Sequence, residues 1–540
     1  MKVIFKIKRT IVMNKDLKLY CLASIFSKLS LSTMKKTFAL FLAILAIKVA
    51  LQFLLIDSAY DLQRDEYLHL DQGKHLAWGY ISVPPVTSWI SWLINLLGGS
   101  VFWVKFFPAL FGTLTIVIVW KTVEELGGKT FALMLSLLAG LFSVLLRINI
   151  LYQPNSSDIC FWTLTYFTII KYVNTNNSKW LYAMALAVGF GFLSKYNIAF
   201  LVIGLFAGLL LTRERKIFLN RNLYFATLIA LVIILPNILW QINNHFPTLH
   251  QLDELSRTQL VNVKRIDFMK DQLMLFINSI FIIVIAFIGF VVYPPFRKYR
   301  FVFWSYAIAV ALYLFLKAKS YYAIGLYPVL IAFGAVYLEK LVSAGWTKYL
   351  KPVAIILVIG MFIPMYLIAF PTKGPAEIEK HNKIYKDFGL LRWEDGKDHN
   401  LPQDFADMIG WSDLAKKVDS VYTQLPDKEN TLVLCDNYGQ AGAVNYYSKF
   451  KDINAVSMNA DYINWFRLDR PIKNIILIQE ASDDDPGRTK ERPLFNKVMM
   501  TGMNDNLFSR EQGTKIYLLQ GAKVNINSFL AKEIEKRKKY

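Results

Sequence analysis

Two adjacent carboxylates, Asp65 and Glu66, lie in a polar stretch, residues 57–85, between the first two long apolar runs of this 540-residue chain. Adjacent residues of a helix point about 100° apart, so we expect only one of the two to reach a given substrate atom. A carboxylate in this place can act as a general base that takes the proton of an attacking hydroxyl group. The alternative is a solvated acidic loop whose carboxylates cap helices.

A third carboxylate, Asp158, begins another apolar run after the polar stretch 153–157. Its alternative role is a helix N-cap, because Asp accepts hydrogen bonds from free backbone N–H groups. Two histidines, His69 and His75, lie close to the first-loop carboxylates. No HExxH or related spacing accompanies them, so ordinary hydrogen bonding is the default role and zinc ligation the alternative.

Lysines that could bind an anion lie at the ends of apolar runs. Lys317 and Lys319 bracket one turn, and Lys195 lies in another. Each ammonium group either snorkels to the membrane surface or binds a lipid phosphate as a point charge. His245 closes the stretch 240–245, for which an aromatic membrane anchor with a polar rim is the simpler role.

The elements that position these residues are mostly membrane helices. Hydrophobic residues make up 55% of the chain, above the roughly 45–50% of soluble domains. The net charge of +21 comes from basic residues between the apolar runs, which favours membrane topology and anionic lipid over nucleic acid. We therefore expect a mainly α, polytopic membrane protein. About eleven apolar runs approach membrane-spanning length, at residues 37–56, 101–122, 130–149, 158–173, 179–194, 196–212, 222–241, 272–293, 299–317, 320–338 and 350–370.

The basic loops indicate how these runs are oriented. Lys and Arg cluster near the N-terminus and in the loops 213–221, 297–300 and 340–351, which all fall on one side when the N-terminus is cytoplasmic. This pattern predicts a multi-pass protein of the plasma (inner) membrane. The acidic first loop, 57–100, then lies on the extracytoplasmic (periplasmic) side, together with the chain after residue 370.

The chain divides into three predicted parts. Residues 1–36 form a basic cytoplasmic segment, with Met1 or Met34 as the start, and residues 37–370 form the membrane domain. Residues 371–540 are polar and are expected to form an extracytoplasmic α/β domain. Its predicted elements are strands at Thr431–Cys435, Lys473–Ile478 and Lys515–Leu519 and a helix at Ala441–Tyr447.

No cofactor is expected from the sequence. Cys21, Cys160 and Cys435 are far apart and provide neither a disulfide framework nor a CxxC metal site. Gly189 and Gly191 lack the GxxxxGK[ST] spacing of a phosphate-binding loop. A divalent metal therefore has no support in the sequence beyond the two loop histidines.

Several short segments together carry a resemblance to known proteins. These segments are Arg64-Asp65-Glu66-Tyr67, Trp78-Gly79-Tyr80, Pro84-Pro85, Asp158, Phe192-Leu193-Ser194-Lys195-Tyr196 and Lys317-Ala318-Lys319. They resemble the GT-C class of integral-membrane glycosyltransferases, and most closely glycosyltransferase family 39. That family includes the protein O-mannosyltransferases and the lipid A aminoarabinose transferases.

The resemblance implies inverting transfer of a sugar from a polyprenyl-phosphate donor to an extracytoplasmic acceptor. It makes Asp65 the base, Glu66 an assisting or positioning residue, and Asp158 the group that orients donor or acceptor. The donor phosphate would be stabilised as a leaving anion by Lys317, Lys319 and Lys195. Further loop residues expected near the substrate are Tyr67, His69, His75 and His245.

Two other functions fit parts of the pattern. A transporter or lipid-linked sugar flippase would carry ionisable residues near the bilayer midplane or broken helices in two related halves. Lys48 is such a residue, although most charges lie at the ends of the runs. A non-catalytic assembly or sensor protein would use residues 371–540 to bind a partner. The sugar, the acceptor (lipid A, surface glycan or protein) and the oligomeric state stay open.

Overall fold

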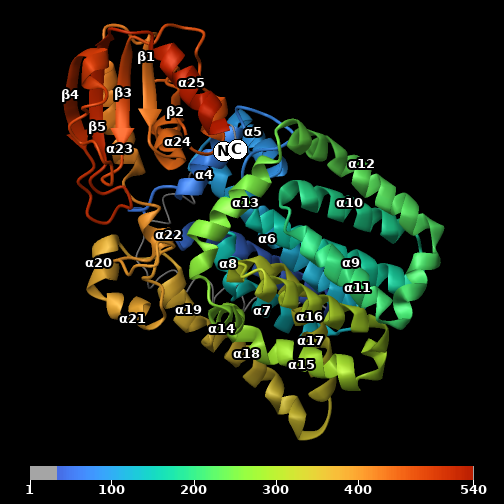
Figure 1. The fold of residues 1–540 in the computed structure, drawn as a ribbon. Coiled ribbons are helices and arrows are strands. Elements are labelled where there is room, and N and C mark those ends of the chain that lie inside the picture. Colours follow the sequence, from blue (N-terminus) through green and yellow to red (C-terminus); the bar gives the residue numbers. More distant parts are fainter. Residues whose placement is uncertain (1–32, 539–540) are drawn as a thin grey trace. The chain divides into compact units, whose positions relative to one another are not determined.

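The structure is a computed structural model that describes residues 33–538, with side chains from residue 38. Cys21 and most of the predicted segment 1–36 lie outside the described residues. The described chain is mainly helical and carries one small sheet near its C-terminus (Figure 1). Residues from Lys48 onward form one unit, which contains every predicted site residue.

The first nineteen labelled elements are helices that cover most of the predicted membrane runs and the loops between them. They are α3 (Thr33–Leu54), α4 (Arg64–Gln72), α5 (Val86–Leu96), α6 (Val101–Glu125), α7 (Thr130–Leu141), α8 (Val144–Ile148), α9 (Asn155–Thr175), α10 (Lys179–Ser194), α11 (Ile198–Leu210), η1 (Arg213–Leu219), α12 (Arg221–Asn243), α13 (Pro247–Thr258), η2 (Leu260–Asn262), α14 (Arg265–Leu275), η3 (Ile277–Ser279), α15 (Ile280–Val292), η4 (Pro294–Tyr299), α16 (Arg300–Phe315) and η5 (Ser320–Leu326). The helices that follow are α17 (Tyr327–Leu341), η6 (Gly345–Tyr349), α18 (Leu350–Gly360), α19 (Phe362–Ala369), α20 (Pro375–Lys380), α21 (Asn382–Asp387), α22 (Gln403–Ala406) and α23 (Trp411–Thr423).

Each of the eleven predicted runs contains helical residues, but the count of eleven spans is not confirmed. By length and composition, four helical stretches of the described chain can cross a membrane: Val101–Glu125, Arg221–Asn243, Ser320–Leu341 and Gly345–Ala369. A fifth is the pair Arg265–Leu275 and Ile277–Val292, which is bent by 61°. Other runs are shorter or broken. The run 130–149, for example, divides at Ser143, whose hydroxyl accepts a hydrogen bond from the Leu145 N–H and caps α8.

Small residues bring some of these helices close together. On α11, Gly204 and Gly208 lie one turn apart, and a Cβ atom added to either would come within 2.7 Å or 2.5 Å of the carbonyl oxygens of Ser305 and Phe301 on α16. This spacing of two glycines is a common way for membrane helices to approach each other closely. The tight packing fixes α16, and with it the turn that carries the predicted phosphate-binding lysines.

The C-terminal part contains a five-stranded mixed sheet with the order β2-β1-β3-β5-β4 (Figure 1). Strand β1 pairs in parallel with β2 and β3, whereas β5 pairs antiparallel with β3 and β4. The three predicted strands and the predicted helix are confirmed, and β2 and β4 are additional. The elements are β1 (Thr431–Cys435), α24 (Tyr438–Tyr447), β2 (Ala455–Ser457), η7 (Ala460–Asn464), β3 (Asn474–Gln479), η8 (Arg492–Leu494), β4 (Phe495–Met503), β5 (Lys515–Ala522) and α25 (Ile526–Lys538).

Helix α4 of the first loop belongs to the hydrophobic core of this C-terminal part. Its buried residues Tyr67, Leu68 and Leu70 share one cluster with Val433 and Ile476 of the sheet. The same cluster contains side chains from α23 and α24, while α25 packs on the opposite face of the sheet. The cluster also contains Val104 of α6, so the helix that carries Asp65 is held by the C-terminal part as well as by a membrane run.

Candidate active site

Asp65 lies in the first turn of α4, and both oxygens of its carboxylate are hydrogen-bonded. The Tyr438 hydroxyl donates to Oδ1 at 2.6 Å, and the Gln153 amide donates to Oδ2 at 3.1 Å. The Arg64 guanidinium lies 3.9 Å from Oδ1 and also donates to the Tyr438 hydroxyl. Because a carboxylate has about four acceptor positions and the Asp65 side chain is 37% exposed, it is both oriented and open to a further donor.

The local sequence explains why α4 begins where it does. The Gln63 side chain accepts a hydrogen bond from the Asp65 N–H, and the Glu66 carboxylate accepts one from the Gln63 N–H. This reciprocal arrangement is a capping box, which satisfies two backbone donors at a helix start. Asp65 and Glu66 also place negative charge at the positive end of the helix dipole.

Glu66 points away from the contacts of Asp65 and is fully buried. Besides the Gln63 N–H, its carboxylate accepts two hydrogen bonds from the Lys105 ammonium, at 2.7 and 2.8 Å, and one from the Tyr152 N–H at 2.6 Å. The Lys105 side chain is only 6% exposed. Glu66 thus joins α4, α6 and the segment before α9, and it holds Tyr152 next to the Gln153 that contacts Asp65.

A line of hydrogen bonds connects Asp65 with Lys195. Gln153, bonded to Asp65, accepts a hydrogen bond from the Asn155 amide at 2.9 Å, and the Lys195 ammonium donates to Asn155 Oδ1 at 2.6 Å. The same ammonium lies 4.5 Å from the centre of the Tyr322 ring, a cation–π contact. The predicted base and one predicted phosphate-binding lysine therefore lie in one polar network at the start of α9.

Asp158 is buried on the same helix and does not act as its N-cap, because Pro154 occupies that position. Its carboxylate accepts hydrogen bonds from the Trp162 indole N–H at 2.8 Å and from the Asn197 amide at 2.9 Å. Asn197 also donates to the Tyr322 carbonyl oxygen at 3.0 Å. Asp158 thus fixes the turn after Lys195 and the turn after Lys319 relative to α9.

The two lysines of the 317–319 turn differ in their contacts. The Lys319 ammonium lies 2.6 Å from Glu394 Oε1 and donates to Gln259 Oε1 at 2.7 Å. Burial opposes the ionisation of Glu394, but the Lys319 ammonium, the Gln403 amide and Arg64 together lower the Glu394 pKa. Lys317 has a φ of 51° and an exposed side chain, with no ion pair or side-chain hydrogen bond to the described residues.

The other predicted loop residues are not brought into this network. Tyr67 is fully buried among aromatic rings. His69 is buried and its Nδ1 lies 3.0 Å from Gln72 Oε1, while His75 stacks on the Trp465 ring at 4.3 Å between centroids. Burial lowers the pKa of both histidines. His245 is exposed, with a φ of 59°.

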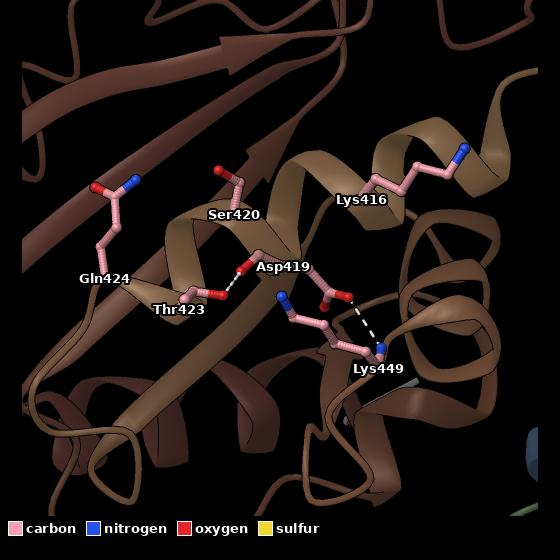
Figure 2. Close-up of a pocket in the computed structure, with 6 residues that line it drawn as sticks. All are labelled: Lys416, Asp419, Ser420, Thr423, Gln424 and Lys449. Atoms are coloured by element: carbon pink, nitrogen blue, oxygen red, sulfur yellow. Dashed lines mark hydrogen bonds between the residues drawn. The ribbon is translucent and has the colours of Figure 1, made fainter.

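No group of three or more His, Cys, Asp or Glu side chains within residues 33–538 could hold a metal ion. A shallow polar hollow of about 450 Å³ lies on α23 (Figure 2). Its one carboxylate, Asp419, already accepts hydrogen bonds from the Ser448 hydroxyl and the Lys449 N–H. The hollow contains none of the predicted site residues; its lining residues are Lys416, Asp419, Ser420, Thr423, Gln424 and Lys449.

Sequence reasoning did not find the contribution of Tyr438, Lys105 or Glu394. Tyr438 begins α24, and two residues separate it from the carboxyl end of the buried parallel strand β1. This end is where α/β sheets usually present residues to a ligand. That position was the one available indication. Lys105 and Glu394 have no local pattern that distinguishes them from other charged residues.

Comparison with known proteins confirms the predicted resemblance to the GT-C class of integral-membrane glycosyltransferases. The family model for dolichyl-phosphate-mannose-protein mannosyltransferases matches residues 82–240. Asp158 and Lys195 lie within the matched stretch, whereas Asp65 precedes it.

Lipid A galacturonosyltransferase RgtD of Rhizobium johnstonii is 24% identical over 206 residues, which are 37% of this chain and 42% of RgtD. The match therefore spans about two fifths of that relative's length. The crystal structure of ArnT from Cupriavidus metallidurans bound to undecaprenyl phosphate has a TM-score of 0.58 and 14% identity, covering 88% of this chain and 97% of ArnT. Apo ArnT gives a TM-score of 0.57 and 13% identity, over 90% of this chain and 98% of ArnT. These likenesses show the fold.

Proposed function

We propose that the protein is an inverting glycosyltransferase that moves a sugar from a polyprenyl-phosphate donor to an extracytoplasmic acceptor. The observation that carries the proposal is the hydrogen-bonded line from Asp65 through Gln153 and Asn155 to Lys195. It places an exposed, oriented carboxylate and a cation in one network. Such a pair matches a reaction in which a hydroxyl proton is removed while a phosphate leaves.

In the proposed reaction, Asp65 takes the proton of the acceptor hydroxyl as its oxygen attacks the anomeric carbon of the sugar. The bond from that carbon to the phosphate oxygen breaks, and polyprenyl phosphate leaves with the electron pair. Lys195, with Lys319 or Lys317, stabilises the phosphate anion. Asp158 orients the ligands through the turns it holds, and Glu66 positions α4 from its buried side. Tyr67, His69, His75 and His245 have no step in this scheme.

The proposed reaction takes place on the extracytoplasmic side of the membrane. Residues 37–370 would form the transferase domain of a multi-pass inner-membrane protein with a cytoplasmic N-terminus, and residues 371–540 its extracytoplasmic α/β domain. The undecaprenyl phosphate in the ArnT structure supports a polyprenyl-phosphate donor. The name of RgtD makes lipid A the first acceptor to test, before surface glycan and protein.

The test is sugar transfer by the purified protein in detergent. Radiolabelled polyprenyl-phosphate sugars are supplied with a lipid extract from the source cells, and the wild type is compared with Asp65→Asn and Asp57→Asn. Asp57 is a matched control in the same loop, since its carboxylate accepts from the Ala59 N–H and has no contact with Asp65. Loss of a general base lowers turnover about 10²–10⁴-fold, so Asp65→Asn should lose at least about 100-fold while Asp57→Asn stays near the wild type.

A fully active Asp65→Asn enzyme would refute the role of Asp65. Flux of lipid-linked sugar across proteoliposomes without any glycosylated product would instead support the transporter or flippase.

A further inference from the structure

We infer that Tyr438 is a positioning residue for Asp65, so that the C-terminal α/β part of the chain completes the active site. The inference rests on the proposed function, in which Asp65 is the base. The contact is the short hydrogen bond from the Tyr438 hydroxyl to Asp65 Oδ1, 2.6 Å long. It is shorter than the 3.1 Å bond from Gln153 to Oδ2, so Oδ1 is the more firmly held oxygen and Oδ2 the freer one.

The Tyr438 phenol is suited to act as a permanent donor. Burial raises its pKa well above the ordinary value for tyrosine, and the neighbouring Asp65 carboxylate raises it further. The phenol therefore stays protonated through the physiological range and donates to Asp65. Arg64 donates to the same phenol oxygen and lies over its ring, with 4.5 Å from the guanidinium carbon to the ring centre. Tyr438 is thus itself fixed from two directions.

The sequence of α24 allows this contact to be short. Glycines occupy the positions where α24 touches α4: a Cβ atom at Gly439 would lie 2.4 Å from Arg64 Cγ, and one at Gly442 would lie 2.5 Å from Tyr67 Cβ. Side chains at these two positions would push the helices apart and draw the Tyr438 hydroxyl away from Asp65. The two glycines, one and four residues after Tyr438, are a second and independent observation that α4 and α24 pack closely here.

The place of Tyr438 in the sheet supports the same conclusion. It is the first residue of α24, and the loop before it leaves the carboxyl end of β1. In α/β sheets, ligands usually bind at the carboxyl ends of the parallel strands, at the point where the connections from two neighbouring strands run in opposite directions along the sheet. Here β1 lies between β2 and β3, and the edge faces Asp65. The sheet therefore directs its binding edge to the base.

Tyr438 would act on the rate through the orientation of the Asp65 carboxylate. Tyr438 fixes the plane of the Asp65 carboxylate through Oδ1, and Oδ2 then receives the acceptor proton. A carboxylate freed on Oδ1 could rotate, and a loss of alignment of this kind costs up to about 100-fold in rate without a corresponding loss of binding. Tyr438 touches neither donor nor acceptor in this scheme.

The test uses full-length protein and three conservative variants. Tyr438→Phe removes only the hydroxyl. Tyr446→Phe is the matched control, because Tyr446 lies on the same helix and donates its hydroxyl to the Gly99 carbonyl oxygen instead. Gly439→Ala keeps the phenol but presses Arg64 away from α24. We expect Tyr438→Phe to lower kcat about 10- to 100-fold, with the KM values of donor and acceptor within about threefold. Gly439→Ala should lower kcat in the same way, and Tyr446→Phe should change none of these values more than about threefold.

A second measurement does not depend on turnover. The infrared carboxylate band of Asp65, obtained from the difference between wild type and Asp65→Asn, should shift in Tyr438→Phe and not in Tyr446→Phe. An unshifted band, or a kcat equal to the wild type, would overturn the inference. Equal losses of kcat in Tyr438→Phe and Tyr446→Phe would show that the effect comes from the packing of α24 in general, and this would also overturn the inference. A wild type that makes no product, with the band shift present, would refute the proposed function and leave the positioning contact standing.

Discussion

The buried ion pair between Glu66 and Lys105 gives the sharpest prediction about stability. Both oxygens of Glu66 face donors only: Oε1 accepts from Lys105 and the Tyr152 N–H, and Oε2 accepts from Lys105 and the Gln63 N–H. In Glu66→Gln the new amide NH₂ group would face a backbone N–H whichever way it turned. The Lys105 ammonium, 6% exposed, would lose its carboxylate partner.

The magnitude follows from these contacts. Breaking a buried ion pair by removing one partner costs about 3–5 kcal/mol, because the other charge is left uncompensated. We therefore expect Glu66→Gln to lower the free energy of unfolding by about that amount. The matched control is Glu124→Gln on α6, where Lys121 lies 2.8 Å from the carboxylate but the two side chains are 56% and 42% exposed. Exposed pairs contribute about 0–1 kcal/mol, so this variant should unfold like the wild type.

The assay is thermal unfolding of the three purified proteins in the same detergent. Glu66→Gln should melt several degrees below the wild type, and Glu124→Gln should match it. Equal melting temperatures for Glu66→Gln and the wild type would refute the structural role of Glu66. If that variant also lost sugar transfer while it melted normally, Glu66 would have to act on the substrate itself.

Three further predictions follow from single contacts. Lys195→Met should raise the donor KM and lower kcat/KM at least about tenfold in transfer assays; an unchanged kcat/KM would remove Lys195 from the phosphate site. Glu394→Gln frees Lys319 from its 2.6 Å ion pair, so polyprenyl phosphate should bind several-fold more tightly in a titration, and weaker binding would show that the pair is needed for structure. Burial raises the pKa of Asp461 to about 6, so the folded state holds a proton that the unfolded state releases near pH 4. Stability then falls as pH rises to about 6, by roughly 1.4 kcal/mol between pH 5 and 7.5, and Asp461→Asn melts should lack this slope; identical slopes would refute it.

The fold was predictable where burial leaves a pattern in the sequence. Strand β1 has the predicted bounds, Thr431–Cys435, because it is central in the sheet and apolar on both faces. Strand β4 was not predicted, since Phe495–Met503 is an edge strand whose residues are mostly exposed and show no alternation. Strand β2 has three residues, Ala455–Ser457, too few for a pattern.

The membrane runs show the limit of hydropathy. The run 130–149 reads as one apolar stretch, yet it divides into α7 and α8 where Ser143 caps the second helix. The pair at 265–292 is bent by 61°. Apolar composition reports which residues avoid water, but the direction of a helix depends on caps and on packing against its neighbours. The number of runs is therefore easier to predict than the number of straight spans.

The site was predictable only in part for a similar reason. Asp65 and Lys195 were predicted through the resemblance of their segments to glycosyltransferase family 39, and the structure brings them into one network. Tyr438 lies 373 residues from Asp65 in the sequence, and no local pattern marks a contact over that distance. The α24 glycines become meaningful only once α4 is seen to pack against them.

The adjacent pair Asp65-Glu66 shows how one helix turn separates two tasks. Because neighbouring side chains diverge by about 100°, Glu66 reaches Lys105 in the interior while Asp65 reaches Tyr438 and Gln153 at the surface. Burial then distinguishes them: the Glu66 side chain is 0% exposed and saturated with donors, and the Asp65 side chain is 37% exposed and keeps acceptor positions free. The buried carboxylate fixes the backbone from which the exposed one projects. The proposed base therefore depends on its buried neighbour: substitution of Glu66 should impair folding first, and substitution of Asp65 should impair turnover first.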